Sequence, residues 1–304
     1  MGKKSKGDSV HGWLIIDKQE GIGSTDVVNQ TRRLLNANKN GHTGTLDPFA
    51  TGVLPIAFGE ATKLIPYVTD GDKEYEFTLK FGSTTDTLDL TGNITQTNGK
   101  IPSKEEILNV LPEFIGHITQ IPPAYSAIKI NGQRAYDLAR KGQDVIIPER
   151  QINIFSLDLL SILSDDEYKF RVSCSKGTYV RTLGADIAKK LGTVGYLTAL
   201  RRTKCAKFDL SHTILLENLK NMSYIAKRQS QLLPLLTSLC DITVFAVREE
   251  DATKLRMGQK ISPKSYEISK LINNEVIATH NNEAVALVRI EETRISPIRV
   301  FNLK

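Results

Sequence analysis

The 304-residue chain is poor in cysteine, and its few cysteines are widely spaced. The three residues, Cys174, Cys205 and Cys240, are odd in number and stand far apart in the sequence. This spacing excludes a disulfide framework and any Cys-x-x-Cys metal site, and it fits a reducing compartment. The five histidines are likewise scattered without the spacing of metal ligands. The sequence therefore predicts neither a metal site nor a redox-active thiol.

Long apolar runs are also missing. No stretch approaches the roughly 18 residues needed to span a bilayer, and the basic N-terminus has no apolar segment behind it that would form a secretory signal. Phosphate-binding Walker A and Gly-x-Gly-x-x-Gly loops are absent, as is the Gly-x-Ser-x-Gly nucleophile elbow. With 40% hydrophobic and 24% charged residues, the composition is that of an ordinary globular protein. We therefore expect a soluble, cytoplasmic protein.

The charge is modestly basic and unevenly distributed. The net charge is +6 and the pI is about 9.0, of which the last 66 residues contribute only +1. The stretch from Arg171 to Lys207 has nine basic residues and one acidic residue, a local charge of +8. Such a run is either a solvated face or a surface that binds a polyanion. The absence of a nearby acidic partner for Arg201, Arg202 and Lys204 makes the polyanion surface at least as good an interpretation.

Apolar periodicity predicts interspersed strands and helices. Strands are expected at 13–16, 75–81 and 168–174, and helices at 25–36 and 179–191. No strand, glycine loop and helix unit repeats as it does in doubly wound folds. The pattern predicts an α+β protein with a mixed, mainly antiparallel sheet flanked by helices.

Three helix ends have recognisable signals. Ser24 follows a glycine turn and is expected to cap the helix at 25–36. Ser103 and Glu106 form a capping box that opens another helix. A short basic helix at 135–141 is expected to end at Gly142.

The pattern changes beyond Pro234 and predicts a small β-rich appendage. Its expected elements are a helix at 249–257 and strands at 242–247, 276–278, 284–288 and 299–303. We divide the chain into a basic tail at 1–12, a catalytic domain at 13–238 and the appendage at 239–304.

One glycine-rich loop carries two residues that could do chemistry, His42 and Asp47. The loop spans residues 41–48 and has too many glycines for a regular helix or strand. On this signal alone an Asp-Pro pair is more often turn chemistry than a catalytic site, and a lone loop histidine is more often structural. Tyr75 is, by its alternation alone, more often a core aromatic.

The neighbouring segments match a family pattern. Residues 41–48, followed by Ala50-Thr51-Gly52-Val53-Leu54-Pro55 and Gly59-Glu60-Ala61-Thr62-Lys63, resemble the catalytic loop of the TruB-type pseudouridine synthases. Six further motifs stand in the family's order: Asp17-Lys18, Lys73-x-Tyr75, Asp86-x-x-Asp89-x-x-Gly92, Pro122-Pro123-x-Tyr125-Ser126-Ala127-x-Lys129, Ser175-Lys176-Gly177-Thr178-Tyr179-x-Arg181 and Leu200-Arg201-Arg202. The resemblance covers about residues 13–210, and the ordered set makes it specific.

This resemblance implies the pseudouridine synthase fold and a bacterial, stand-alone tRNA enzyme, because the motif from Pro122 continues with Asn131-Gly132. It also implies that residues 239–304 are a PUA-like RNA-binding domain. One departure is Gln19, where bacterial members usually have proline, and its presence removes a φ restraint from that turn.

The implied reaction turns the T-loop uridine of tRNA, U55, into pseudouridine. The N1–C1′ bond breaks, the uracil rotates and C5 is joined to C1′, and no cofactor is needed. The resemblance assigns the reacting carboxylate to Asp47, acting as a nucleophile at C1′ or C6 or removing the C2′ proton through a glycal. It assigns to Arg181 the cation that keeps this carboxylate ionised in a dry pocket. It places Tyr75 against the base, where its hydroxyl could help remove the C5 proton.

The resemblance also implies a set of RNA contacts. The target base must be turned out of its stack at a cost of a few kcal/mol; His42 would fill the space left behind and Leu200 would form an apolar wall for the uracil. Tyr179 and Asp89 are expected to contact the base or ribose. The candidates for phosphate contact are Lys18, Lys63, Lys176, Arg201 and Arg202. The expected partner is the T-stem-loop of tRNA. We expect the protein to act as a monomer and not to bind a membrane.

Two other functions stay open from the sequence. The first is an RNA-binding or tRNA-folding module that does not use Asp47. The second is a hydrolytic nucleosidase that pairs Asp47 with Asp89 in the manner of glycosidases. A hydrolase would release free uracil, whereas an isomerase leaves the mass of the RNA unchanged.

Overall fold

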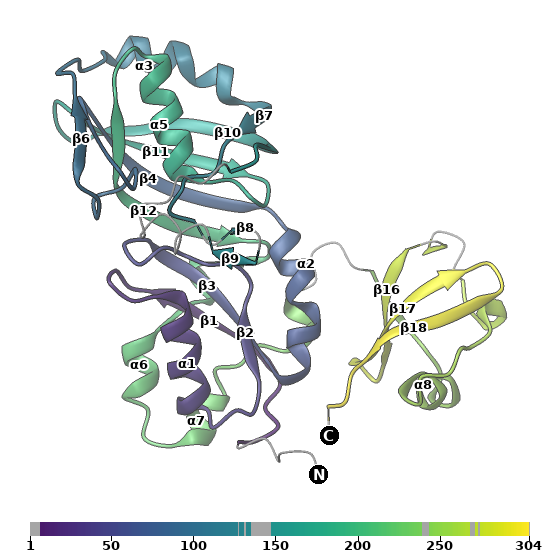
Figure 1. Ribbon diagram of the computed structural model, residues 1–304. Coiled ribbons are helices and arrows are strands. Elements are labelled where there is room, and N and C mark those ends of the chain that lie inside the picture. The colour runs from purple at the N-terminus through teal and green to yellow at the C-terminus, as the bar shows by residue number, and fades with distance from the viewer. Residues whose placement is uncertain are drawn as a thin grey trace.

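The computed structural model describes residues 7–126, 128–130, 132–134, 147–238, 243–267, 271–272 and 274–303 (Figure 1). The basic helix predicted at 135–141 lies outside these residues. Within the described part of the chain, no helix is long and apolar enough to cross a membrane.

A large mixed sheet forms the body of the protein. Its strands run in the order β14-β1-β3-β12-β4-β11-β10-β7, with β2 added to β3 and β13 to β12. Only two pairs, β1 with β14 and β3 with β12, are parallel. The predicted α+β fold with a mainly antiparallel sheet is confirmed. The bounds are β1 (Gly12–Lys18), β2 (Asn40–His42), β3 (Thr51–Phe58), β4 (Lys73–Phe81), β7 (Gly116–Gln120), β10 (Arg150–Ile162), β11 (Glu167–Cys174), β12 (Gly195–Cys205), β13 (Phe208–Asp209) and β14 (Ile214–Leu215).

The alternation in β4 shows why these strands form a sheet. Phe77, Leu79 and Phe81 are all buried on one face, as expected for a period of two. Phe77 stacks on Phe170 of the neighbouring strand β11 with ring centroids 5.2 Å apart. These contacts fix the register in which Tyr75 reaches the site, two residues before Phe77.

Helices cover parts of this sheet. Helix α5 (Val180–Lys190) buries Leu183 and Ile187 against β4 and β12, and α1 (Ser24–Leu34) lies beside β2 and α6 at the other end of the sheet (Figure 1). The predicted capping box at Ser103 and Glu106 is confirmed at the start of α3 (Lys104–Val110). The remaining helical segments are η1 (Gly59–Leu64), α2 (Ile65–Asp70), η2 (Leu111–Phe114), η3 (Leu210–His212), α6 (Leu216–Lys220), α7 (Ile225–Gln229) and η4 (Leu235–Ser238).

Two short hairpins lie outside the large sheet. They pair β5 (Ser83–Thr85) with β6 (Ile94–Thr97), and β8 (Lys129–Ile130) with β9 (Gln133–Arg134). The first hairpin surrounds the turn that carries Asp89. The second follows the segment of Tyr125, which also reaches the site.

The C-terminal region is a separate four-stranded sheet, as the β-rich prediction requires. Its order is β15-β16-β17-β18, and α8 packs on it around a core of its own. The strand predicted at 299–303 is misplaced, since β18 begins at Arg294 and ends at Val300. The sequence pattern did not predict this strand because it contains Pro297, although proline is tolerated in an edge strand. The bounds are β15 (Val244–Ala246), α8 (Glu249–Arg256), η5 (Pro263–Ser265), β16 (Glu275–His280), β17 (Glu283–Glu291) and β18 (Arg294–Val300).

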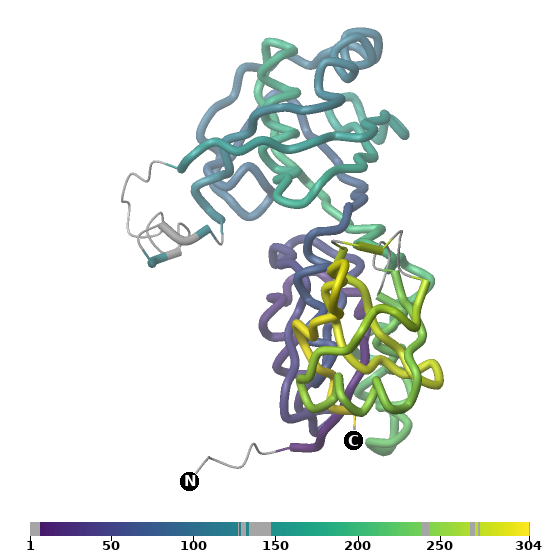
Figure 2. Tube along the Cα trace, turned by 90° about the vertical axis from the view of Figure 1, so that its right-hand side faces the viewer, coloured from purple at the N-terminus to yellow at the C-terminus, as the bar shows by residue number. Residues whose placement is uncertain are grey.

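The two sheets share a buried junction. Ile277, Leu287 and Phe301 join the cluster around Trp13 and Ile15. Polar contacts rim this cluster: Tyr67 donates to Glu275 at 2.5 Å, the backbone N–H of Asn302 to Glu60 at 2.9 Å, and Lys63 to the Val300 carbonyl at 2.6 Å. The C-terminal sheet thus contacts η1 and α2, and in Figure 2 it lies in yellow in front of the purple N-terminal part of the chain.

Candidate active site

A cavity of about 270 Å³ opens between the glycine-rich loop, β4, β12 and the start of α5. It brings together seven residues that the sequence singles out from four separate segments: Asp47, Tyr75, Lys176, Tyr179, Arg181, Leu200 and Arg202. In the described part of the chain no group of His, Cys, Asp and Glu could hold a metal ion.

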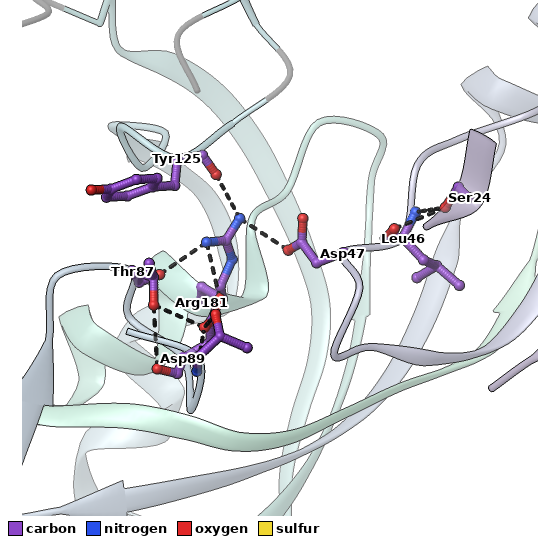
Figure 3. A network of polar contacts seen from close by, with 8 residues as sticks. Ser24, Leu46, Asp47, Thr87, Asp89, Tyr125 and Arg181 are labelled. Carbon is purple, nitrogen blue, oxygen red and sulfur yellow. Dashed lines mark hydrogen bonds and ion pairs between the residues drawn. The ribbon is translucent and has the colours of Figure 1, made fainter. Parts of the chain in front are cut away.

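An ion pair between Asp47 and Arg181 lies at the centre of the cavity wall. Arg181 Nη2 is 2.9 Å from Asp47 Oδ2, and the arginine side chain is only 4% exposed against 35% for the aspartate. The carboxylate is thus the more exposed partner, and Figure 3 shows the guanidinium between Asp47 and the turn that carries Thr87 and Asp89. The guanidinium also donates to the Thr87 carbonyl at 2.9 Å and the Tyr125 carbonyl at 2.8 Å.

Burial and charge oppose each other at Asp47. Burial raises the pKa of its carboxyl above the ordinary aspartate range, and the adjacent Asp89 charge adds to the rise. Arg181, and more weakly Lys18, lower the pKa. The arginine therefore limits the rise in pKa and favours the ionised carboxylate.

Asp89 supports Arg181 from behind instead of facing the cavity. Its side chain is 4% exposed, and its Oδ2 lies 3.2 Å from Arg181 Nη1. Its Oδ1 accepts from the Thr87 hydroxyl and from the N–H and hydroxyl of Thr91 at 2.6–2.9 Å. These bonds and the pair with Arg181 occupy the carboxylate, a placement that does not suit the predicted contact of Asp89 with base or ribose.

Two clamps hold the backbone on either side of Asp47. On one side the Ser24 hydroxyl donates to the Leu46 carbonyl and accepts from the Leu46 N–H, both at 2.8 Å (Figure 3). On the other side the Pro48 carbonyl accepts from the Gly21 N–H at 2.8 Å and from Lys18 Nζ at 3.1 Å. The cap predicted for Ser24 is wrong: Gly23 is the N-cap, and the Ser24 side chain makes no capping bond.

Lys18 is fully buried, with 0% of its surface exposed. Its ammonium group donates to the carbonyls of Gln19, Ile22 and Pro48 at 2.8–3.1 Å. Burial lowers its pKa to about 8. Since all three N–H donors are used inside the protein, Lys18 does not suit the predicted phosphate contact and instead positions the Asp47 loop.

Arg202 is the second predicted phosphate ligand that lies inside the protein. It is 1% exposed and donates to the carbonyls of Val53 at 2.7 Å and Gly44 at 3.2 Å. Its own carbonyl lies so close to Gly52 that a Cβ there would approach it to 2.2 Å. Arg202 therefore joins β12 to the start of β3 and the Asp47 loop, and it is not a surface cation.

The basic stretch has acidic partners that the sequence hides. Arg201 forms a two-point pair with Asp17 at 2.8 and 3.1 Å. Three further ion pairs join the basic stretch to residues on other strands and helices: Arg171 with Glu76 at 2.9 Å, Lys176 with Asp70 at 2.9 Å and Lys190 with Glu113 at 2.6 Å. These acidic partners are far away in sequence, so the absence of a neighbouring acidic residue did not mean that Arg201 is unpaired.

Tyr75 contributes a neutral phenol to the cavity. Burial raises its pKa to about 12, with the nearby Arg202 charge opposing the rise. Leu200, 7% exposed, lines the same cavity from the adjacent strand β12. Together they offer apolar and aromatic surface to a planar base.

His42 and Lys63 lie outside the lining of the cavity. His42 Nδ1 accepts from the Gly44 N–H at 3.2 Å, and burial followed by the Arg202 charge lowers its pKa, so its ring is neutral at pH 7. Lys63 is tied to Glu60 and the Val300 carbonyl at the junction of the two sheets. This placement does not suit the predicted phosphate contact of Lys63.

Tyr179 is held by residues that the sequence did not single out. Its N–H donates to Gln120 Oε1 at 2.8 Å, and Gln120 Nε2 donates back to the Tyr179 carbonyl at 3.1 Å. The Arg150 guanidinium lies 5.4 Å from the centroid of its ring. Gln120 and Arg150 belong to the paired strands β7 and β10, so only the strand pairing brings them to the site, and no local pattern marks them.

Comparison with known families gives matches over most of the chain. The model described as "TruB family pseudouridylate synthase (N terminal domain)" matches residues 32–180. A second model, "tRNA pseudouridylate synthase B C-terminal domain", matches residues 181–240.

Curated relatives match over the full length. The chain is 44% identical over 309 residues to tRNA pseudouridine synthase B of Caulobacter vibrioides, covering 100% of each chain. It is 43% identical over 308 residues to the protein of the same name from Rhodospirillum rubrum, again covering 100% of each.

Solved structures share the fold. The chain resembles a chain of "Crystal Structure of a Cbf5-Nop10-Gar1 Complex" with a TM-score of 0.73 and 23% identity, covering 96% of this chain and 84% of that one. It resembles a chain of "Structure of H/ACA RNP bound to a substrate RNA containing 2'-deoxyuridine" with a TM-score of 0.72 and 19% identity, covering 99% and 92%.

Proposed function

Because the chain belongs to the TruB family of pseudouridylate synthases, we propose that it converts U55 in the T loop of tRNA to pseudouridine with Asp47 as the reacting carboxylate. Family membership and the full-length relatives make it a tRNA pseudouridine synthase, an isomerase. The target position and the role of each residue are the proposal.

The reaction is an internal rearrangement of one nucleotide. The N1–C1′ bond breaks, the uracil turns, and a C5–C1′ bond forms; C5 loses its proton and N1 gains one, so the mass of the RNA does not change. Asp47 acts as an ionised carboxylate, either as a nucleophile at C1′ or C6 or as a base at C2′. Both routes fail when the carboxyl is protonated.

The observation that carries this proposal is the Arg181–Asp47 pair at 2.9 Å in the cavity wall. Four acceptors fix the guanidinium: two carboxylates and the carbonyls of Thr87 and Tyr125. A cation held this rigidly orients one carboxylate oxygen and favours the ionised form, while the other oxygen faces the cavity.

The cavity suits a base turned out of its stack. Tyr75 and Leu200 supply flat and apolar walls, and Tyr179 borders the mouth. The neutral ring of His42 suits the space vacated in the RNA stack. With a pKa of about 12, the Tyr75 phenol keeps its proton at pH 7, so we assign Tyr75 to stacking and positioning in place of proton removal at C5.

Other parts of the surface would bind the rest of the RNA. Lys176 is 58% exposed and Arg201 36% exposed, so each can exchange its carboxylate partner for a phosphate. We assign residues 239–304 to RNA binding and residues 13–238 to catalysis. We further propose that the protein acts on the RNA as a monomer.

The test replaces the carboxylate without changing its shape. Asp47→Asn and the surface control Asp158→Asn are incubated with a T-stem-loop RNA, and pseudouridine is mapped by carbodiimide modification and primer extension. The expected result is loss of product with Asp47→Asn, retained RNA binding, and normal product with Asp158→Asn. Turnover by Asp47→Asn would end the assignment.

The same assay separates the rival functions. An RNA-folding module would bind the RNA without forming product even as the unmodified protein. A two-carboxylate hydrolase would release uracil, which mass spectrometry detects. The occupied, buried carboxylate of Asp89 argues against the hydrolase, because its oxygens already accept from Thr87, Thr91 and Arg181.

A further inference from the structure

Arg150 lies at the wall of the cavity without an assigned role. It is the first residue of β10, and its guanidinium covers the Tyr179 ring at 5.4 Å. Within the described chain, the one hydrogen bond of its side chain is a long one, from Nη1 to the Gly177 carbonyl at 3.4 Å. The side chain is half-buried and lines the same cavity as Asp47.

The other cations of the cavity are already satisfied. Arg181 pairs with two aspartates, and Lys176 pairs with Asp70 at 2.9 Å. Lys73 and Arg202 donate to backbone carbonyls. Among the described residues that line the cavity, Arg150 is the cation with neither a carboxylate partner nor a short bond to a carbonyl.

The neighbouring loop is shaped around this guanidinium. Gly177 has a φ of +84°, and a Cβ there would lie 3.4 Å from Arg150 Nη1. The planar group therefore lies between the Gly177 backbone and the Tyr179 ring, with its remaining N–H donors not bonded to described residues. A half-buried charge is costly without a partner, so this arrangement favours an anion that the described residues do not supply.

We propose that Arg150 binds a phosphodiester of the RNA strand that enters the cavity. This inference rests on the proposed function, which brings a nucleotide to Asp47. A guanidinium can bond two phosphate oxygens side by side, whereas an ammonium offers a point charge. Bound in this way, Arg150 fixes the strand beside Tyr179, on the α5 side of the cavity.

Binding is measured in the full chain with the additional Asp47→Asn change, so that the RNA stays unmodified. Arg150→Met is expected to weaken binding of T-stem-loop RNA by about 10- to 100-fold, as for the loss of a charged hydrogen bond. The slope of log Kd against log salt falls by about 0.7, the contribution of one single-strand phosphate. Arg150→Lys recovers the slope but only part of the affinity.

Arg171→Met is the matched control. Arg171 lies on β11 and is paired with Glu76 at 2.9 Å, and it does not line the cavity. Its loss is expected to leave the RNA affinity and the salt slope near those of the parent.

A scan of neutral phosphates identifies the contact directly. A single methylphosphonate is placed in turn at each linkage around the target uridine. At the linkage that Arg150 contacts, the neutral group weakens RNA binding by the parent. At the same linkage it does not weaken binding by Arg150→Met, because this variant lacks the contact. The proposal is overturned if every linkage weakens both proteins equally.

The Tyr179→Leu background separates direct contact from an indirect effect through the ring. If Arg150 contacts phosphate itself, Arg150→Met still lowers the salt slope in this background. If its only function is to hold Tyr179, the slope does not change and the proposal fails. These outcomes concern binding alone, so they stand apart from loss or survival of product formation with Asp47→Asn.

Discussion

Replacing Ser24 with alanine tests whether the clamp on Leu46 positions the reacting carboxylate. Ser24 is 3% exposed and Leu46 is 3% exposed, so water cannot replace the lost hydroxyl. The change removes two hydrogen bonds of 2.8 Å and leaves a buried N–H and a buried carbonyl of Leu46 without that partner. At about 1–3 kcal/mol for each of the two unsatisfied groups, the free energy of unfolding should fall by about 2–6 kcal/mol.

The effect on the reaction is expected to exceed the effect on binding. Leu46 immediately precedes Asp47, and a shift of about 1 Å at a reacting group costs about 10²-fold in rate. Single-turnover rates at saturating RNA should therefore fall by about two orders of magnitude with Ser24→Ala, while the RNA affinity stays close to that of the unmodified protein.

Ser103→Ala separates positioning from general instability. Ser103 also makes a side-chain bond to a backbone N–H, at 3.2 Å, but at the exposed start of α3. Its loss should cost about 1 kcal/mol of stability and leave the rate unchanged. A Ser24→Ala enzyme with a normal rate, or a Ser103→Ala enzyme slowed in proportion to its lost stability, would refute the reasoning.

Three further predictions concern charge and packing around the site. The single-turnover rate should fall in acid with a midpoint above the ordinary aspartate pKa of about 4, because burial raises the pKa of Asp47. Asp89→Asn should move this midpoint to lower pH, since the Asp89 charge contributes to the rise. A pH profile of single-turnover rates checks both. Because the folded state binds this proton more tightly than the unfolded state, stability falls as pH rises through the interval between the two pKa values; Asp47→Asn should therefore unfold in urea at pH 7 no earlier than the unmodified protein, and clear destabilisation would contradict the sign. Gly52→Ala should cost about 3 kcal/mol or more, because φ is +99° and the new Cβ would approach the Arg202 carbonyl to 2.2 Å, whereas Gly258→Ala, with φ +76° and open space, should cost only about 1 kcal/mol in the same denaturation assay.

Local sequence signals correctly predicted those strands and helix ends that depend on neighbouring residues. The alternation from Tyr75 to Phe81 gave β4, and Ser103 with Glu106 gave the start of α3. The motif resemblance predicted that Asp47 and Arg181 would meet, and they lie 2.9 Å apart. Their catalytic roles stay predictions until the substitutions are made.

Long-range partners explain what the sequence could not supply. The sequence predicts Lys18 and Arg202 at the surface, yet both side chains are buried. They donate to backbone carbonyls 30 and 149 residues away, respectively. Arg201 pairs with Asp17 across 184 residues. A backbone carbonyl is present at every position, so no residue pattern reveals which ones will receive a cation. For the same reason the Ser24 hydroxyl was expected at its own helix rather than at Leu46.

The junction between the two sheets has a consequence for the order of synthesis. Trp13 and Ile15 emerge early from the ribosome, but their cluster is completed only by Ile277, Leu287 and Phe301. At about 5–20 residues per second, the roughly 60 residues from Val244 onward take several seconds to make. During that time the apolar surface that Ile277, Leu287 and Phe301 cover in the folded protein is exposed to solvent. Truncation before β15 would make this exposure permanent, so a shortened chain that loses activity would report aggregation as readily as lost RNA binding.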